Sequence, residues 1–424
     1  MTGMRAAILT AADILSTAKS VRIISHHDAD GAVAAGLLCW ALQREDITYR
    51  ASLWSELSIA DIGRGDVLAI CDMGSGQIGE IQSTGWEHVI VCDHHVMPSF
   101  TPSPPGIVHI NPCLWGLDGC RDACASTLAF LVARAMDERN ADLIPLTLAG
   151  IVGDRQHLHL SGPNKAIVDE GLSRGLIKRE RGPLIGGHVG EYITKSVDPF
   201  FKGLSGRPKA TEAFLSSLGS AEDKELISHL TQHLLRQGAR PEAVRELEDW
   251  QYWLPPFGVY VRELSTVLGV CARSCPDEAI AICLGDREAW EHGRRLSDDY
   301  DRRVLRCLIA LERGAIELRH IQYFYAERGM GGICAGLGMS WLLNQEKATL
   351  ALSSSDDLLK VSSRGTPHLV KKGLNLAEAL RSASASVGGY GGGHPIAAGA
   401  TAPRERERDF LDLVDQLVGE QLGE

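Results

Sequence analysis

The chain has 424 residues, 44% of them hydrophobic and 23% charged, which excludes a disordered, collagen-like or coiled-coil protein. At about 150 residues per domain, this length predicts two or three domains. The formal net charge of -11 argues against a protein that coats duplex nucleic acid by bulk electrostatics, although an acidic metal-binding nuclease remains compatible with it.

The first 155 residues alternate short apolar, β-rich runs with helical patterns. We expect buried strands at 21–25, 67–71, 88–92 and 107–110, and helices at 32–42, 126–135 and 143–152. This alternation predicts the α/β class, with a mostly parallel sheet wrapped by helices. Ligands bind beyond the carboxyl ends of such strands, so the polar residues that directly follow the runs are candidates for a site.

The rest of the chain predicts a helical insertion and a second, smaller α/β domain. Helix-prone segments at 210–218 and 223–236 indicate the insertion, and strands are expected at 279–283, 318–325, 348–352 and 358–362, with a terminal helix after 404. A lead helix at 286–313 carries seven arginines, which we interpret as a solvated basic face; the alternative is the lining of a groove for a nucleic-acid backbone. The predicted domains are 1–160, 161–257 and 258–424.

Two properties of the chain bear on its compartment. No apolar run reaches the roughly 18 residues that span a bilayer, and the N-terminal segment has no secretory cleavage pattern. Eleven scattered cysteines, an odd number, are expected to be reduced thiols. We therefore expect a cytoplasmic protein that does not bind membranes.

Polar residues that suit metal binding follow the first predicted strand. Residues two apart in an extended stretch point the same way, so His26, Asp28 and Asp30 can converge on one point. The alternative is a solvated turn in which Asp28 or Asp30 caps the next helix. Whether His26 or His27 faces a metal is left open.

The same pattern recurs further along the chain. Asp72 follows the second strand, the triplet Asp93-His94-His95 follows the third, and Asp154 ends a helical run. Each alone suits a cap or a turn, but together the carboxylates would repel one another along one sheet edge unless cations were present. A pair of metal ions resolves that conflict.

Mixed carboxylate and imidazole ligands favour Mn²⁺, with Mg²⁺ or Co²⁺ as alternatives. Two such ions about 4 Å apart stabilise the attacking and leaving oxygens of a phosphoryl displacement. The motifs therefore predict hydrolysis of a phosphoester.

These motifs resemble, in order, the four motifs of the DHH phosphoesterase superfamily: His26-x-Asp28-x-Asp30-Gly31, Asp72, Asp93-His94-His95 and Gly150-Ile151-Val152-Gly153-Asp154. Towards the C-terminus, Gly391-Gly392-Gly393-His394 resembles the GGGH signature of the DHH-associated domain, and the segment from Lys360 to Arg364 resembles its basic substrate-binding strand. With both domains present, the chain is similar to RecJ-like nucleases, particularly the archaeal ones.

The resemblance implies a role for each residue. The metal ligands would be His26, Asp28, Asp30, Asp72, His94 and Asp154, with Asp72 suited to bridging two ions. Asp93 would orient His94, and His95 would touch the scissile phosphate. The substrate strand would be bound by Arg364, Gly391, Gly392, Gly393 and His394.

The resulting prediction is a two-metal, Mn²⁺-dependent phosphodiesterase that removes nucleotides from single-stranded DNA or RNA in replication or repair. One alternative shortens the substrate, to that of an oligoribonuclease or a cyclic-dinucleotide phosphodiesterase. Another, implied by the resemblance to a eukaryotic helicase subunit, is a replication scaffold that binds the GINS complex and has little activity. The polarity of digestion, the choice between DNA and RNA, and a homo-oligomeric state are left open.

Overall fold

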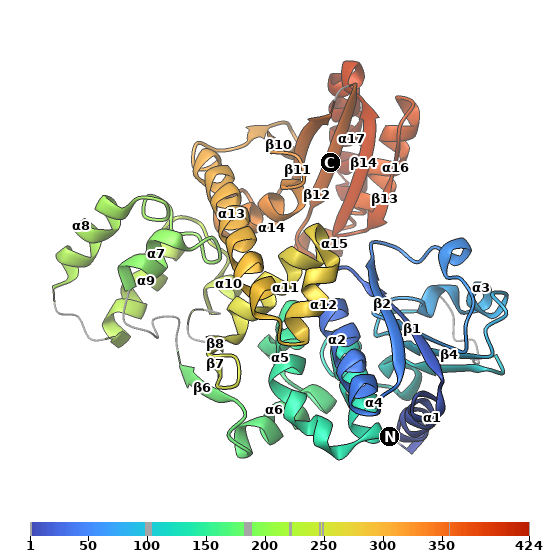
Figure 1. The fold of residues 1–424 in the computed structure, drawn as a ribbon. Coiled ribbons are helices and arrows are strands. Elements are labelled where there is room, and N and C mark those ends of the chain that lie inside the picture. The colour runs from blue at the N-terminus through green and yellow to red at the C-terminus, as the bar shows by residue number, and fades with distance from the viewer. Residues whose placement is uncertain are drawn as a thin grey trace. The chain divides into compact units, whose positions relative to one another are not determined.

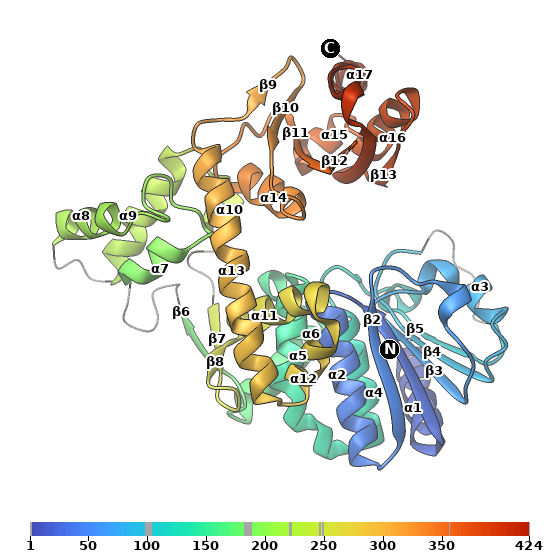
Figure 2. The same ribbon diagram turned by 45° about the horizontal axis from the view of Figure 1, so that its top comes forward.

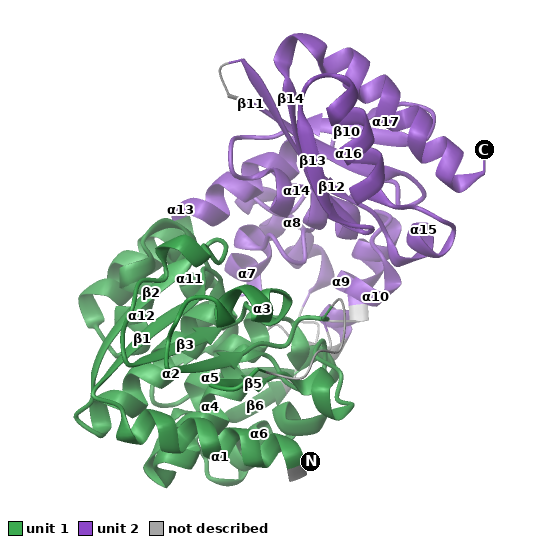
Figure 3. Ribbon diagram, turned by 90° about the vertical axis from the view of Figure 1, so that its right-hand side faces the viewer, with its two compact units in different colours: residues 1–181, 250–298 green, residues 182–249, 299–424 purple. Residues whose placement is uncertain are grey.

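The computed structural model, drawn in two views in Figure 1 and Figure 2, describes residues 2–97, 104–181, 189–219, 223–245, 247, 250–355 and 357–423. The chain forms two compact units (Figure 3). Unit 1 comprises residues 1–181 and 250–298, and unit 2 comprises residues 182–249 and 299–424. The chain therefore passes from one unit to the other three times.

The centre of unit 1 is a five-stranded sheet in the order β2-β1-β3-β4-β5. Its strands are β1 (Ser20–His26), β2 (Thr48–Trp54), β3 (Val67–Cys71), β4 (His88–Cys92) and β5 (Ile107–Ile110). All neighbouring strands are parallel, which confirms the predicted sheet and four of its strands. The prediction missed β2, because this edge strand buries only Leu53 and so has no apolar run.

Helices cover one face of this sheet, and α3 with its neighbouring loops covers the other. Ile23 and Ile24 are both fully buried, yet they belong to separate cores because consecutive strand residues point to opposite faces. The helices of this part are α1 (Thr2–Thr17), α2 (Ala29–Arg44), α3 (Ile78–Gln82), α4 (Ala125–Met136), α5 (Ile144–Gly153) and α6 (Gly162–Ser173).

Residues 250–298 return to unit 1. Strands β6 (Lys178–Arg181), β7 (Trp250–Leu254) and β8 (Val259–Tyr260) form a small antiparallel sheet, followed by α11 (Val261–Ser274) and α12 (Pro276–Cys283). Helix α11 packs on α2 and α5, and α12 packs on α2. The Trp40 indole N–H donates to the carbonyl of Cys283 at 2.8 Å, which ties α12 to α2.

Two expectations differ from this arrangement. The compact units do not follow the predicted borders at 160 and 257, because α11 and α12 bury their apolar faces in unit 1. The strand predicted at 279–283 is wrong, since these residues lie in α12. Pro276 at the first turn, with Asp277 and Glu278 after it, is a helix-start signal that outweighs a short apolar run.

Unit 2 contains a mixed six-stranded sheet in the order β13-β14-β12-β11-β10-β9. Its strands are β9 (Ile316–Glu317), β10 (Ile321–Tyr325), β11 (Ala348–Ser355), β12 (Leu358–Arg364), β13 (Tyr390–His394) and β14 (Ala397–Pro403). Helix α14 (Gly331–Trp341) packs against β11 and β12, while α16 (Leu376–Ser386) and α17 (Glu407–Leu422) pack against the opposite face. The confirmed fold class is therefore α/β in both units.

The remaining helices are α7 (Val189–Lys195), α8 (Pro208–Leu218), α9 (Asp223–Arg236), α10 (Pro241–Arg245), α13 (Arg287–Leu311) and α15 (Pro367–Lys371). Helix α13, the predicted lead helix, begins in unit 1 and ends in unit 2. Its Arg294 pairs with Glu263 at 3.1 Å, and Arg303 pairs with Glu327 at 2.8 Å. These ion pairs favour a solvated charged face over a bare basic groove.

Among the described helices, none combines the length and the apolar character needed to cross a bilayer.

Candidate metal centre

The predicted metal-binding residues meet at the point where the strand order of the parallel sheet reverses. From β1 the chain moves outward to β2, and it then returns to β3 on the other side of β1. Open α/β sheets bind ligands beyond the carboxyl ends of the strands at such a reversal. His26 ends β1, Asp28 and Asp30 come directly after it, and Asp72 follows β3.

The hydrogen bonds between neighbouring strands continue for one residue past β3 and β4, and they fix the backbone of two aspartates. The backbone N–H of Asp72 donates to the carbonyl of Cys92 at 2.8 Å, and that of Asp93 donates to the carbonyl of Ile110 at 3.1 Å. Asp72 has φ = 60°, a left-handed conformation that Asp tolerates better than most residues, and the chain turns there. Both side chains are almost fully buried, which fixes their positions.

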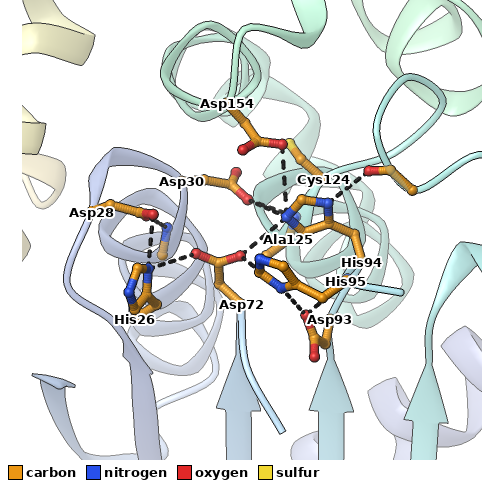
Figure 4. Close-up of polar contacts among 12 residues, drawn as sticks. His26, Asp28, Asp30, Asp72, Asp93, His94, His95, Cys124, Ala125 and Asp154 are labelled. Carbon is orange, nitrogen blue, oxygen red and sulfur yellow. Dashed lines mark hydrogen bonds and ion pairs between the residues drawn. The ribbon is translucent and has the colours of Figure 1, made fainter. Parts of the chain in front are cut away.

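On its Oδ2 side, Asp72 faces a first donor group, by which we mean a set of side chains that could donate electron pairs to a metal ion (Figure 4). There the Nδ1 of His26 lies 3.3 Å from Asp72 Oδ2 and 2.8 Å from Asp28 Oδ2. The other oxygen of Asp28 accepts the N–H of Gly31 at 2.9 Å and caps α2, so Asp28 is both a cap and a member of this group. The structure thus brings His26 to the carboxylates, whereas the buried Nδ1 of His27 contacts no polar partner among the described residues.

Asp72 faces a second donor group on its Oδ1 side. The Nε2 of His94 lies 3.2 Å from Asp72 Oδ1, 3.7 Å from Asp154 Oδ2 and 4.0 Å from Asp30 Oδ2. Asp154 follows α5 directly, so it ends a helix, whereas the other carboxylates follow strands or begin α2. The other five expected ligands therefore lie around Asp72 (Figure 4).

Asp30 is held by the first turn of α4. Its two oxygens accept the backbone N–H groups of Ala125 at 2.7 Å and Ser126 at 3.0 Å. The N-terminus of a helix stabilises a negative charge through its unpaired N–H groups and its dipole. The carboxylate of Asp30 is thereby kept in place beside His94.

The expected partnership of Asp93 with His94 is wrong. Asp93 Oδ1 instead contacts Nδ1 of His95 at 2.7 Å, while Nδ1 of His94 lies 2.7 Å from the carbonyl of Gly119. A carbonyl can only accept, so His94 donates through Nδ1 and presents Nε2 to the carboxylates. The ring nitrogen of His95 nearest to Asp72 is the one that Asp93 already occupies.

Several residues that support the site were missed by sequence reasoning. Gln156 donates to Asp154 Oδ2 at 2.6 Å and to the carbonyl of Gly119 at 2.8 Å, and so links Asp154 to the anchor of His94. Asn111 donates to Ser75 Oγ and to the carbonyl of His95, and the N–H of Ser75 donates to Asp93. Asn111 directly follows β5, so the strand-end rule could have found it.

The pKa values show how the centre balances its charges. Burial, and then the charge of Asp28, raise the pKa of Asp72 to about 6; burial, and then the charge of Asp30, raise the pKa of Asp154 to about 7. Burial opposes protonation of His26 and His94, but hydrogen bonds and ion pairs with carboxylates outweigh it and raise their pKa values to about 10 and about 11. Protonated imidazoles therefore offset part of the negative charge of the carboxylates at pH 7.

The donor set fits a pair of divalent cations. The groups His26-Asp28-Asp72 and Asp72-His94-His95 each have ligand atoms within 4.8 Å of one another, and Asp72 belongs to both. Carboxylate and imidazole donors without a thiolate suit Mn²⁺ or Mg²⁺ better than a structural zinc ion. A metal-binding role for these residues is therefore consistent with their chemistry and their spacing.

We expect the binding of Mn²⁺ at pH 7 to release between about two and three protons, because Asp154, with a pKa of about 7, is also partly protonated. His26 and His94 must lose the protons that their raised pKa values retain before they can coordinate. The affinity should therefore rise with pH towards about 10 and fall more steeply below pH 7, where Asp154 and Asp72 also become protonated.

Titration calorimetry in buffers of different ionisation enthalpy measures the released protons. A His94→Ala variant should release about one proton fewer than the wild type. Binding of Mn²⁺ without proton release would contradict this charge balance.

The predicted substrate residues lie in unit 2, on neighbouring strands. His394 on β13 is in register with Ala397 on β14, and Ala397 is in register with Arg364 on β12. The glycine-rich segment is an edge strand rather than a loop, since Gly391, Gly392 and Gly393 all lie in β13. Arg364 and His394 thus lie in the same row across the sheet, with β14 between their strands.

Comparisons with known proteins agree with these motifs. Residues 20–152 match the family model described as the DHH family N-terminal domain, and residues 321–420 match the DHHA1 domain. An uncharacterized protein of Methanocaldococcus jannaschii, MJ0831, is 30% identical over 420 residues, which is 95% of this chain and 94% of the relative.

Two solved structures share the fold over nearly the whole chain. Exonuclease RecJ bound to manganese aligns with a TM-score of 0.64 and 19% identity, covering 98% of this chain and 94% of the other. CDC45 from Entamoeba histolytica aligns with a TM-score of 0.65 and 10% identity, covering 98% of this chain and 97% of the other. At these identities the likeness establishes the fold alone.

Proposed function

The chain belongs to the DHH family of phosphoesterases, and on that premise we propose that it is a two-metal exonuclease acting on single-stranded nucleic acid. The observation that carries the proposal is the position of Asp72. Its two oxygens face two different donor groups, 3.3 Å from His26 and 3.2 Å from His94. A carboxylate shared in this way suits a site that binds two cations side by side.

The proposed ligands are His26, Asp28, Asp30, Asp72, His94 and Asp154, and the proposed ion is Mn²⁺, with Mg²⁺ as the alternative. A RecJ structure of the same fold contains manganese. Two cations bound here would supply Lewis-acid charge at the oxygens of the scissile phosphate. The protein orients three of the ligands through hydrogen bonds: Gly119 holds His94, Gln156 holds Asp154, and the first turn of α4 holds Asp30.

His95 is proposed to contact the phosphate directly. Its side chain is 61% exposed, and the hydrogen bond to Asp93, which exceeds the opposing effect of burial, raises its pKa. Nδ1–H is committed to Asp93, so when the ring carries its second proton the Nε2–H is free to donate to a phosphoryl oxygen. A charged donor aimed at that oxygen stabilises the negative charge that develops during hydrolysis.

In unit 2, Arg364, His394 and the glycines Gly391, Gly392 and Gly393 are proposed to bind the substrate strand. Arg364 donates to the carbonyl of Ser363 at 2.8 Å, and it has no carboxylate partner among the described residues. A guanidinium without an ion pair is suited to a phosphate.

The proposal is tested by incubating the purified chain and Mn²⁺ with a single-stranded 30-mer of DNA or RNA, labelled at either end. An exonuclease releases nucleotides progressively from one end, so the product ladder gives the polarity and the preferred sugar together. A matched duplex and an EDTA control accompany the assay. Failure to cleave any of these strands, or cleavage of a circular single strand, would overturn the proposal.

A scaffolding role, such as binding to a GINS-type replication complex, is the second candidate because the fold is shared with CDC45. The six proposed ligands and their supporting hydrogen bonds favour catalysis instead.

An oligoribonuclease is a further alternative that keeps the same chemistry. A labelled dinucleotide assayed beside the 30-mer separates an oligoribonuclease from an enzyme that prefers longer strands.

A further inference from the structure

One face of the unit 2 sheet carries an exposed tyrosine that the proposed chemistry does not use. A Cβ built on Gly391 would lie 3.0 Å from the Leu380 carbonyl and from Ser384 Oγ, so Gly391 faces α16. Side chains alternate along a strand, and Tyr390, Gly392 and His394 therefore point to the opposite face. We call this opposite side of β12, β13 and β14 the open sheet face.

Strand register arranges the open sheet face in three rows. The first row is Tyr390, Thr401 and Lys360; the second is Gly392, Gly399 and Ser362; the third is His394, Ala397 and Arg364. Tyr390 and His394 are four residues apart, about 13 Å along the strand. The third row is the proposed phosphate site, so the first row lies beyond it along the same surface.

Tyr390 and Lys360 at the two ends of the first row are exposed, whereas Thr401 between them is buried. Helix α14 lies against the second and third rows, since a Cβ on Gly331 would lie 3.4 Å from Ser362 Oγ and one on Gly332 would lie 3.4 Å from the Arg364 guanidinium. A Cβ on Gly392 would have no atom within 4 Å, and Tyr390 is 73% exposed. Beside the bare glycine row, the exposed ring of Tyr390 offers a flat apolar surface, and Tyr is enriched at binding surfaces.

The chemistry of the open sheet face fits single-stranded nucleic acid. None of its nine positions is a carboxylate, whereas Lys360, Arg364 and His394 can all donate to phosphates. Lys360 is exposed and has no ion pair among the described residues. The glycines of the second row leave the backbone bare between the aromatic ring and the proposed phosphate site, so a strand can lie close to the sheet.

We propose that Tyr390 stacks on a base of the substrate strand and that Lys360 contacts its backbone. The inference rests on the proposed function and adds a base contact to it. Single-strand binding proteins combine aromatic stacking platforms with cationic contacts to the backbone, and stacking tolerates every base because each has a π-face. Tyr390 therefore adds affinity without sequence preference.

The test measures the binding of a fluorescein-labelled single-stranded octamer to the full chain in EDTA, in DNA and RNA forms. Tyr390→Ala should weaken binding about 5- to 150-fold, and Tyr390→Phe should bind within about 2-fold of the wild type because the stacking ring remains. An octamer of abasic nucleotides should bind the wild type and Tyr390→Ala equally. Tyr325→Ala is the matched control, because Tyr325 is 57% exposed on β10 of the same sheet and its hydroxyl contacts Glu407 of α17, on the other face.

Lys360→Gln provides an independent arm. It should reduce the slope of log affinity against log salt by about 0.7, the value for one phosphate contact on a single strand. Equal binding of the normal octamer by the wild type and Tyr390→Ala, or equal losses in Tyr390→Ala and Tyr390→Phe, would overturn the stacking inference. If the wild type neither binds nor cleaves any single strand, the proposed function itself fails.

Discussion

Replacing Asp72 with Asn should reduce Mn²⁺-dependent hydrolysis about 1000-fold or more. The two oxygens of Asp72 face separate donor groups, so one substitution disturbs both proposed cation positions. Losing several kcal/mol of charge stabilisation corresponds to such a factor, because each 1.36 kcal/mol changes the rate tenfold. Asn keeps the shape of the side chain and removes a charge that burial penalises, so the fold should survive.

The rate is measured on the labelled strand and the fold by thermal denaturation in EDTA. Asp46→Asn is the matched control: Asp46 also has a left-handed backbone, with φ = 56°, but it is exposed in the turn between α2 and β2. This control should keep full activity. Mn²⁺-dependent cleavage at the wild-type rate by Asp72→Asn would rule out the bridging position.

The location of the centre could be predicted because it follows from local pattern and topology. Buried runs such as 67–71 and 88–92 end in Asp72 and Asp93, and parallel strands bring their carboxyl ends to one edge. The prediction needed no knowledge of which helix packs where. For that reason the six expected ligands converge even though β2 and α12 were missed or misassigned.

The orientation of each side chain could not be predicted in the same way. The anchor of His94 is the carbonyl of Gly119, and every residue has a carbonyl, so the sequence carries no sign of this contact. Asp93 and His94 are adjacent in the motif, which suggested that they pair. Successive side chains after β4 point in different directions, however, so Asp93 contacts His95, two residues on. Local sequence order is therefore a poor guide to hydrogen-bond partners within the triplet.

The division of the chain depends on long-range packing. Residues 261–283 look like the start of a second domain because they follow a helical insertion, yet their apolar faces bury against α2 and α5. Composition reveals that α11 is amphipathic but not which surface it will cover. The border between the units consequently falls within α13, where the sequence shows no linker.

Gly150→Ala should lower the free energy of unfolding by about 3 kcal/mol and reduce hydrolysis with it. A Cβ at position 150 would lie 2.5 Å from Ser126 Cβ, closer still to Ser126 Oγ, and 2.9 Å from Asp30 Oδ1. Overpacking a buried contact costs about 1–3 kcal/mol. Here the overlap also pushes on the turn of α4 whose N–H groups hold Asp30, so packing and activity should fall together.

Thermal denaturation in EDTA and the strand assay measure the two effects, and two further variants separate their causes. Gly79→Ala, in α3, adds the same methyl group where no atom lies within 4 Å, and it should leave activity unchanged. Adding Ser126→Gly to Gly150→Ala removes the main overlap and keeps the backbone N–H that Asp30 accepts, so it should restore stability and most of the activity. If Gly150→Ala alone had wild-type stability and rate, the added methyl group would not displace the turn of α4 that holds Asp30, and the prediction would be wrong. Ser126 is not a proposed ligand, so recovery of activity on adding Ser126→Gly would show that the packing of α4 against α5 positions the centre.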